Sequence, residues 1–375
     1  MGSLFLFFLH PPYPSQPRQL MNTTYQARQQ RLCASLQKNN LTALLVTHAA
    51  DRFYLSGFEL HDPQCNESAG CLLLTAEGDA WLMTDSRYLD AAKRVWPEDR
   101  LFIYSGLRDE QMATFIRNLG IRSLGIESIS MPVIQYKELG KTLDLVLTRN
   151  LVEDLRVIKD EAEMTALRTS CALNHRVFDQ LQHLLKPGLS EAMLAWKIEQ
   201  LFREQGASEL SFETIAAVGP NAALPHALAG STQITDNCPV LIDMGCRLDD
   251  YCSDQTRTFW VGDLPTPVFT ETLALVQEAQ QEGIRHYLPG TPIREADAAV
   301  RSYFTKYGVE KYFTHSLGHG VGLETHEPPS VGPRSEAVFQ PGMVVTAEPG
   351  LYYPRWGGVR WEHMVVITEE GHDVL

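Results

Sequence analysis

The chain has 375 residues, of which 44% are hydrophobic and 21% are charged, and its formal net charge is −14. That length allows two domains with substantial cores, and the composition is ordinary for a soluble globular protein. The acidic charge argues against a surface for nucleic acid or anionic membranes, because both require a basic field. We therefore expect neither a nucleic-acid partner nor a membrane partner.

The cysteines and the first residues bear on location. The seven cysteines include no CxxC pair, a pattern that favours reduced thiols in the cytoplasm over a disulfide framework. The apolar run Leu4–Leu9 is shorter than a signal peptide needs, and no cationic residue precedes it. We expect residues 1–20 to be a flexible extension, or a segment upstream of a natural start at Met21. No run approaches the ~18 apolar residues of a membrane span.

Residues 21–153 alternate between helix-like and strand-like segments, which predicts a small α/β domain. Short apolar runs bounded by turn residues predict strands, and apolar residues repeating at helical spacing predict helices. In chain order we expect a helix at 26–40, a strand at 42–47, two strands within 71–84 around a Gly78-Asp79 turn, a helix at 109–120, and strands at 123–127 and 145–150.

Residues 154–375 show a different pattern, in which the order of elements repeats. A long amphipathic helix is expected at 156–185, ended by Lys186-Pro187-Gly188, and Ser190 is placed to cap a second helix at 191–206. Strands with an acidic pair follow, and then helices at 268–286 and 293–306, further strands and a second acidic pair. The repeat predicts two similar helix-helix-hairpin halves that enclose one site.

The first acidic pair is Asp243 and Asp254, in VLIDMGCRLDDYCSDQTRTFWVG. VLID and TRTFWV are typical of strands, with a polar turn between them. A symmetric hairpin centred between Leu248 and Asp249 would place the two carboxylates directly opposite each other, with roughly 4.5–5.5 Å between their Cβ atoms. Like charges so placed destabilise a sheet, so we expect a cation between them.

The second pair, Glu348 and Glu362, repeats this pattern in TAEPGLYYPRWGGVRWEH. A hairpin centred on Arg355 places these two carboxylates opposite each other, between apolar flanks. Burying an uncompensated ion costs several kcal/mol. Two converging acidic pairs therefore predict bound cations.

A histidine-rich stretch, HSLGHGVGLETH at 315–326, supplies a nitrogen ligand. As a strand, it would place His319, Val321 and Leu323 on one side and Gly320 and Gly322 on the other, where another backbone can approach closely. One imidazole with four carboxylates predicts a site for two metal ions roughly 3.5–4 Å apart. Oxygen-rich ligands with one histidine favour Mn²⁺ over a structural Zn²⁺.

The chain resembles the pita-bread metallopeptidases, the family of methionine aminopeptidase, aminopeptidase P and prolidase. In the second domain the resemblance rests on GPNAALPH, LIDMG with YCSDQTRTF, HSLGHGVGLETHE, TAEPGLYY and GGVRWEH. In the first domain, YLSGF at 54–58 and TDSRY at 84–88 resemble proline peptidases and creatinase. The resemblance implies an α+β pita-bread catalytic domain at 154–375, with a curved antiparallel sheet, after a smaller α/β creatinase-like N-terminal domain at 21–153.

The resemblance also implies roles for individual residues. Glu348 would accept a proton from the attacking water in addition to binding metal. His226 and His326 match substrate-side histidines that stabilise the intermediate or move protons, and His315 and Arg360 match outer positions of the proline-specific branch. Arg360 would either hold an acidic ligand in place or meet a substrate carboxylate. The implied metal ligands are Asp243, Asp254, His319, Glu348 and Glu362, with Asp254 and Glu362 bridging two ions, most readily Mn²⁺, with Co²⁺ or Zn²⁺ as alternatives.

The family branch sets the expected activity. The N-terminal domain favours the proline-specific branch, and the chain length and HEPP favour an Xaa-Pro aminopeptidase acting on peptides with proline second. The alternative is an Xaa-Pro dipeptidase (prolidase). A creatinase-like enzyme or a non-catalytic binding protein fits less well, because all five ligands are present. Trp361 and His363 depart from the usual aliphatic residue and Asp or Asn, and the resemblance implies a homodimer or tetramer.

Overall fold

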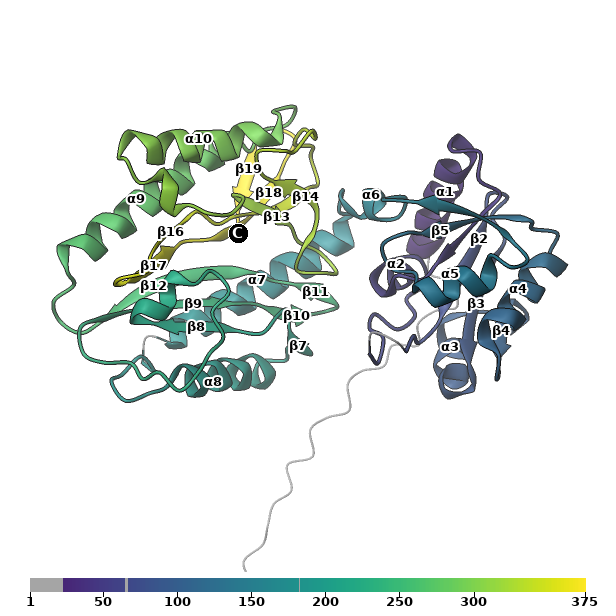
Figure 1. Ribbon diagram of the computed structural model, residues 1–375, viewed down its shortest axis with the longest axis horizontal. Helices are drawn as coiled ribbons and strands as arrows, with labels where there is room; N and C mark the ends of the chain where they lie inside the picture. The colour runs from purple at the N-terminus through teal and green to yellow at the C-terminus, as the bar shows by residue number, and fades with distance from the viewer. Residues whose placement is uncertain (1–22, 65–66, 182) are drawn as a thin grey trace, which may run out of the picture. The chain divides into compact units, whose positions relative to one another are not determined.

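A computed structural model describes residues 23–64, 67–181 and 183–375, so the extension expected at 1–20 lies outside the described residues. The chain divides into two compact units between Leu155 and Arg156 (Figure 1). A short helix, α6 (Glu153–Arg156), lies at this division. In the described ranges, every helix is too short or too polar to cross a membrane.

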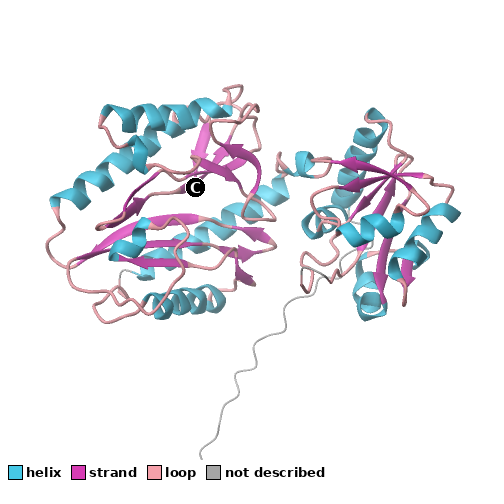
Figure 2. Cartoon of the chain, in the orientation of Figure 1, coloured by secondary structure: helices cyan, strands magenta, loops and turns pink. Residues whose placement is uncertain are grey.

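The N-terminal unit is a six-stranded mixed sheet with helices packed on it (Figure 2). Its strand order is β4-β3-β2-β1-β5-β6. The predicted turn at Gly78-Asp79 is confirmed: Leu74 pairs with Ala80, and Gly78 takes a φ of 98° that suits glycine. The strands are β1 (Ala43–Val46), β2 (Cys71–Thr75), β3 (Ala80–Asp85), β4 (Leu101–Tyr104), β5 (Ser123–Glu127) and β6 (Asp144–Thr148).

All the elements expected in this unit are present, and further ones were not predicted. Short or weakly periodic segments form α2, α3, α5 and β4, which the sequence did not distinguish from loops. The helices are α1 (Thr23–Lys38), α2 (Ala49–Ser56), α3 (Leu89–Val95), α4 (Arg108–Asn118) and α5 (Val133–Leu139), with 3₁₀ turns η1 (Ser86–Tyr88) and η2 (Glu98–Arg100).

In the C-terminal unit, two helix pairs flank strands that pair only in antiparallel fashion among the described residues (Figure 1). Each pair covers its own apolar core, as the two predicted halves require. The predicted Ser190 cap is present, since the Ser190 hydroxyl accepts from the Met193 N–H. The helices are α7 (Glu161–Leu181), α8 (Glu191–Glu204), α9 (Pro267–Ile284) and α10 (Ile293–Lys306), with 3₁₀ turns η3 (Gly219–Ala223) and η4 (Glu310–Tyr312).

The start of α7 differs from the prediction, which began the helix at residue 156. Asp160 and Glu163 form a reciprocal capping box: the Asp160 N–H donates to Glu163 Oε2 and the Glu163 N–H donates to Asp160 Oδ1, both at 3.0 Å. A capping box fixes a helix N-terminus. The residues between α6 and this box instead form a bend, after which the Lys159 N–H donates to the Gly342 carbonyl.

The first acidic hairpin has a different register from the one predicted. Its strands are β9 (Cys238–Met244), β10 (Cys246–Leu248), β11 (Tyr251–Cys252) and β12 (Gln255–Val261). Asp243 lies opposite Thr256, not Asp254. The turn is one residue later than expected because Asp249 and Asp250 both take positive φ, 51° and 70°, which is the pattern of a two-residue type I′ turn. Since the shift moves the partner by two residues, Asp254 keeps the same face and becomes a diagonal neighbour.

The second acidic hairpin has the predicted register. Gly350 pairs with Arg360, and Ala347 pairs with His363, so Glu348 and Glu362 occupy opposed positions between the two ladders. The strands are β15 (Val344–Ala347), β16 (Gly350–Tyr353), β17 (Gly357–Arg360) and β18 (His363–Ile367).

The histidine-rich stretch forms a shorter strand than expected. β13 (Gly318–Gly320) ends before Val321, so the expected alternation of Val321 and Leu323 is wrong. The expected close backbone approach is confirmed at Gly320, whereas a Cβ at Gly322 would meet the side chain of Glu327. A Cβ at Gly318 would lie 2.2 Å from the Thr346 carbonyl oxygen, and one at Gly320 would lie 2.3 Å from the Pro328 carbonyl oxygen. The remaining strands are β7 (Glu209–Leu210), β8 (Ile215–Val218), β14 (Glu327–Val331) and β19 (His372–Val374).

Candidate metal centre

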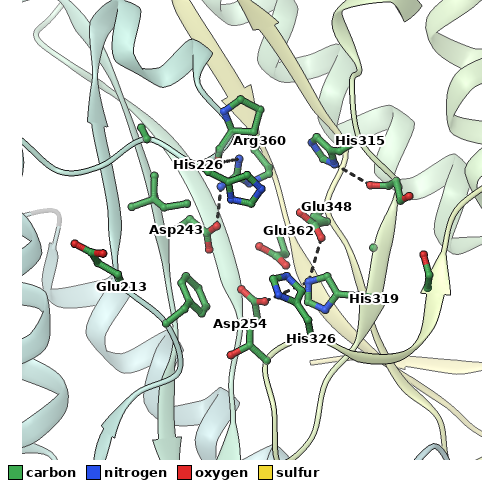
Figure 3. Close-up of a pocket in the computed structure, with 18 of the residues that line it drawn as sticks. Glu213, His226, Asp243, Asp254, His315, His319, His326, Glu348, Arg360 and Glu362 are labelled. Carbon is green, nitrogen blue, oxygen red and sulfur yellow. Dashed lines mark hydrogen bonds and ion pairs between the residues drawn. The ribbon is translucent and has the colours of Figure 1, made fainter. Parts of the chain in front are cut away.

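The five predicted ligands line one cavity of about 480 Å³ (Figure 3). They come from both halves of the unit: β9 and the residue just before β12 on one side, and β13, the residue just after β15 and the residue just before β18 on the other. Four carboxylates and one imidazole therefore meet where the two acidic hairpins face each other. The five are Asp243, Asp254, His319, Glu348 and Glu362.

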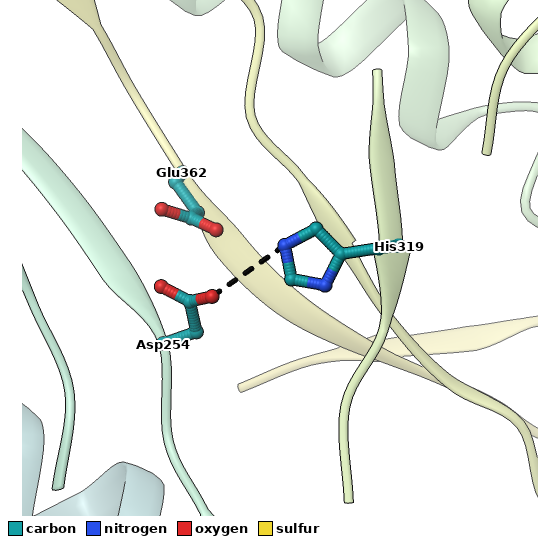
Figure 4. Close-up of side chains that lie close together, drawn as sticks. All are labelled: Asp254, His319 and Glu362. Carbon is teal, nitrogen blue, oxygen red and sulfur yellow. Dashed lines mark ion pairs between the residues drawn. The ribbon is translucent and has the colours of Figure 1, made fainter. Parts of the chain in front are cut away.

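His319 is held so that one ring nitrogen faces the carboxylates. Its Nδ1 lies 3.0 Å from the Gly320 carbonyl oxygen and therefore carries the proton. Its Nε2 lies 3.2 Å from Glu348 Oε1 and 3.6 Å from Asp254 Oδ2. Figure 4 shows this ring facing Asp254 and Glu362, and one donor atom from each of these three residues lies within 4.8 Å of the others. A backbone carbonyl on the far nitrogen is the usual arrangement for a metal-binding histidine.

The buried carboxylates oppose one another's ionisation. Burial first, and then the neighbouring carboxylates, raise the pKa values of Asp254 and Glu362 well above their usual range, and burial and Glu348 raise that of Asp243. Burial also acts on Glu348, but the hydrogen bond and charge of His319 outweigh it and lower that pKa to about 2.

The donor set fits divalent cations. Asp243 Oδ1 and Glu362 Oε1 are buried and have no hydrogen-bond partner among the described residues. An unpartnered buried carboxylate oxygen is costly, because the charge loses its hydration without compensation. Metal ions bound between these oxygens and His319 Nε2 would remove that cost, and hard oxygen donors with one imidazole suit Mn²⁺ and related ions.

Arg360 supports the acidic residues from β17. Its Nη2 donates to Asp243 Oδ2 at 2.6 Å, its Nε to Thr256 Oγ1 at 3.0 Å, and its Nη1 to the hydroxyl of Tyr352 at 2.9 Å and the carbonyl of Pro225 at 3.2 Å. The residue is 2% exposed. Of the two roles considered for Arg360, this geometry favours holding an acidic ligand in place over meeting a substrate carboxylate.

Two residues of this network were not identified from the sequence. Thr256 Oγ1 donates to Glu362 Oε2 at 2.6 Å while accepting from Arg360, and the Tyr352 hydroxyl lies 2.8 Å from His315 Nε2. Neither side chain is charged, so neither stood out. Thr256 was nonetheless detectable in principle, because it lies directly opposite Asp243 in the hairpin.

Comparison with known proteins identifies the family of the chain. The model of metallopeptidase family M24 matches residues 165–369, and that of the creatinase/prolidase N-terminal domain matches residues 28–158. The chain belongs to metallopeptidase family M24. It is 34% identical, over 340 residues, to an Xaa-Pro dipeptidase of Pyrococcus horikoshii, and the match covers 90% of this chain and 93% of that protein.

Solved structures of M24 peptidases agree with the fold. The Xaa-Pro dipeptidase from Bacillus anthracis superimposes with a TM-score of 0.87 at 35% identity, covering 93% of this chain and 97% of that one. An X-Pro aminopeptidase from Thermotoga maritima gives a TM-score of 0.83 at 26% identity, covering 92% and 96%. The expected pita-bread catalytic domain, the creatinase-like N-terminal domain and the metallopeptidase class are confirmed. Membership of M24 implies divalent metal ions.

The other residues predicted for the site lie around the same cavity (Figure 3). His226 and His326 are exposed at its wall, and the His326 ring centre is 4.0 Å from that of His319. Burial, and then the charge of His319, lower the pKa of His326 to about 4, so its imidazole is neutral at pH 7. His315 is fixed between the Ser316 carbonyl and Tyr352, and burial lowers its pKa.

The rest of the cavity wall is apolar or carries hydroxyl groups, apart from the exposed Glu213 and the backbone at Gly318. Leu228 is 78% exposed at the opening. Arg360 is the one lysine or arginine among the described lining residues, and its guanidinium is already engaged. The remaining wall residues include Phe212, Ile215, Pro225, Ala227, Ser316, Thr325 and Ser330.

Proposed function

We propose that the protein is a two-metal Xaa-Pro dipeptidase, which hydrolyses the bond between a first residue and a C-terminal proline. Support comes from the Xaa-Pro dipeptidases of Pyrococcus horikoshii and Bacillus anthracis, which match nearly the whole chain. The comparisons thus favour the alternative reading of the sequence over the aminopeptidase that we expected first. Within the structure, the observation that best supports a two-metal peptidase is the cluster of four carboxylates around His319.

The ligands for two divalent ions, proposed to be Mn²⁺, would be Asp243, Asp254, His319, Glu348 and Glu362. When bound, the ions would polarise the scissile carbonyl and favour ionisation of the attacking water. Glu348 is the proposed general base, since its carboxylate faces the cavity beside the other acidic residues.

The two exposed histidines would act on the substrate. A neutral His326 can donate one N–H to the carbonyl oxygen on which charge develops, and this bond strengthens in the transition state. His226, on the opposite side of the carboxylates in Figure 3, would contact the peptide from that side. The apolar residues Phe212, Ile215 and Leu228 would exclude water around the proline ring and the first side chain.

A second candidate is an Xaa-Pro aminopeptidase, and the cavity wall favours it. A dipeptide carries a free carboxylate next to its scissile bond, which is best met by a cation. The lining residues of the described chain provide no lysine or arginine other than the engaged Arg360. The imidazoles of His226 and His326 would have to serve this carboxylate. A third substrate residue would remove the need for such a partner.

The test compares three substrates that share the same first residue. Metal-stripped protein is incubated with and without Mn²⁺ and offered Xaa-Pro, Xaa-Pro amide and Xaa-Pro-Yaa, with Asp254→Asn as the inactive control. Mn²⁺-dependent cleavage of the dipeptide in clear preference to the amide supports the dipeptidase. Equal or faster cleavage of the amide and tripeptide selects the aminopeptidase. Failure to cleave any of them while Mn²⁺ binds would refute Xaa-Pro specificity.

The expected homodimer is also retained as a proposal. Sedimentation of the full chain measures it directly, and a monomeric mass at micromolar concentration would contradict it.

A further inference from the structure

The side chain of a second arginine, Arg257, contacts the main chain of Glu362. Arg257 lies on β12, one residue after Thr256, and its side chain reaches the junction between β17 and β18. Its Nη1 donates to the Glu362 carbonyl oxygen and, at 2.9 Å, to the Thr256 carbonyl oxygen. Its Nη2 lies 2.7 Å from His363 Nε2. Arg257 therefore connects three points around one proposed metal ligand.

The contact with His363 fixes the state of that imidazole. A guanidinium can only donate, so His363 Nε2 must accept. The proton then lies on Nδ1, which is 3.1 Å from Gln280 Oε1. This orientation leaves the Gln280 amide Nε2 to donate to the carbonyls of Ala347, at 2.6 Å, and Trp361, at 3.1 Å.

These contacts matter because Glu362 lies in a gap between two ladders. β17 ends at Arg360 and β18 begins at His363, so residues 361 and 362 take no part in the named strand pairs. The Glu362 N–H donates to the Thr256 carbonyl at 3.2 Å, and its own carbonyl accepts from Arg257. Trp361 packs against the same guanidinium, whose carbon lies 4.4 Å from the ring centre. Residues 361 and 362 are therefore held by hydrogen bonds to β12 and by packing of the Trp361 ring, instead of by regular strand pairing.

We propose that Arg257, His363 and Gln280 are positioning residues that set where the Glu362 carboxylate lies relative to Asp254 and His319. We call these three residues the Glu362 clamp. This proposal rests on the proposed function, because it takes Glu362 as a metal ligand. The clamp includes one of the two positions at which the chain departs from the usual M24 pattern, His363, and packs against the other, Trp361. It thus gives those departures a shared role, in which an imidazole accepts from Arg257.

The test measures metal affinity rather than turnover alone. His363→Phe keeps a ring of similar size but removes both hydrogen bonds, and His363→Gln keeps an acceptor within reach of Arg257. The matched control is His372→Phe, because His372 lines the same small cavity of about 330 Å³ but has no hydrogen bond or ion pair with the three clamp residues in the described structure. Calorimetry of the metal-stripped full chain with Mn²⁺ gives the affinity, and thermal unfolding without metal gives stability.

We expect His363→Phe to weaken Mn²⁺ binding roughly 10–100-fold, as removal of such outer partners does. His363→Gln should recover most of the affinity, and His372→Phe should match the native protein. At saturating Mn²⁺, kcat should fall for His363→Phe while KM for the dipeptide is unchanged. A purely structural role would lower the metal-free melting temperature and leave the affinity of the folded protein intact.

The outcomes separate the two proposals. Native-like affinity in folded His363→Phe, or an equal loss in His372→Phe, overturns the clamp and leaves the proposed function standing. If the native protein binds no Mn²⁺, the proposed function fails and the clamp fails with it. Should His363→Phe not fold, Arg257→Lys replaces it under the same criteria, since lysine keeps the charge but cannot reach all three acceptors at once.

Discussion

Glu327 follows His326 directly and is the centre of a buried ion cluster, which we call the Glu327 triad. Its Oε1 lies 2.7 Å from Lys159 Nζ and its Oε2 lies 2.5 Å from Arg156 Nη2. The side chains of Glu327, Arg156 and Lys159 are 2%, 3% and 1% exposed. The triad ties the end of α6 and the residues between α6 and α7 to the first residue of β14, and so to the loop that carries His326.

Replacing Glu327 by Gln removes the anion that Lys159 and Arg156 share; Arg156 keeps its ion pair with Glu324, whereas Lys159 loses this carboxylate. Breaking a buried pair by removing one partner costs about 3–5 kcal/mol, because the remaining charge is uncompensated. We therefore expect Glu327→Gln to lower the free energy of unfolding by about that amount. The amide nearly preserves the shape, so this loss reports charge rather than packing.

Equilibrium unfolding of the full chain in urea, followed by tryptophan fluorescence, measures this difference. The matched control is Glu324→Gln. Glu324 also meets Arg156, at 2.8 Å, but its side chain is 37% exposed, so its loss should cost less than about 1 kcal/mol. If Glu327→Gln unfolds within 1 kcal/mol of the native protein, or no lower than Glu324→Gln, the reasoning from buried charge is refuted.

The triad also predicts the direction of a pH effect. Burial opposes ionisation of Glu327, but the charges of Lys159 and Arg156 prevail and lower its pKa below the usual 4.5. The folded state thus releases this proton more readily than the unfolded chain does. The stabilisation is complete above about pH 4.5 and is lost as the pH falls through the lower folded pKa. Glu327→Gln should remove this part of the acid sensitivity.

Three further predictions concern the centre and the N-terminal unit. Arg360→Met should weaken Mn²⁺ binding roughly 10–100-fold in calorimetry, because Asp243 loses its donor; a raised dipeptide KM with native metal affinity would instead mean that Arg360 binds the substrate. Gly318→Ala should destabilise by about 1–3 kcal/mol in urea unfolding, because its Cβ would lie 2.2 Å from the Thr346 carbonyl oxygen, whereas Gly371→Ala, with its nearest atom at 3.8 Å, should be near neutral. Burial, and then Asp51, raise the pKa of Glu127 to about 8, so native stability should fall between about pH 4.5 and 8, by at most about 1.4 kcal/mol per pH unit, relative to Glu127→Gln. Equal pH slopes for the native protein and Glu127→Gln would contradict this last prediction, and the exposed Glu77→Gln is its control.

The sequence predicted which residues share the site better than it predicted their exact pairing. The first hairpin turned one residue later than expected, at Asp249-Asp250, because positive φ at both positions allows a tight type I′ turn. That error changed the partner of Asp243 from Asp254 to Thr256 without changing its face, because side chains alternate with a period of two. If the strand pairing itself had shifted by one residue instead of two, one carboxylate would have pointed to the opposite face of the sheet. The spacing of the two acidic residues therefore predicts which face of the sheet they share, whereas the residue that each one pairs with across the hairpin depends on the geometry of the turn.

Other features depended on contacts that a local pattern cannot contain. Helix α7 begins at Glu161 because Asp160 and Glu163 cap each other, although the apolar repeat continues upstream. β13 ends at Gly320, where the chain must turn past Glu327; a Cβ at Gly322 would lie 2.2 Å from the Glu327 carboxylate. The start of α7 and the end of β13 are both set by polar side chains, whereas the predicted bounds of these elements followed the spacing of apolar residues.

Thr256 shows why uncharged residues of a metal centre escape a search for ligands. Its hydroxyl accepts from Arg360 and donates to Glu362, while its carbonyl accepts from Arg257 and from the Glu362 N–H. A hydroxyl can accept and donate at once, which neither a carboxylate nor a guanidinium can do. Because Arg360 also holds Asp243, one threonine links a ligand of the first hairpin to a ligand of the second. The two Arg360 partners, Asp243 and Thr256, lie opposite each other in the pairing of β9 with β12, so their spacing is set by that strand pairing rather than by metal ions. The acidic residues can therefore be held together before any ion binds.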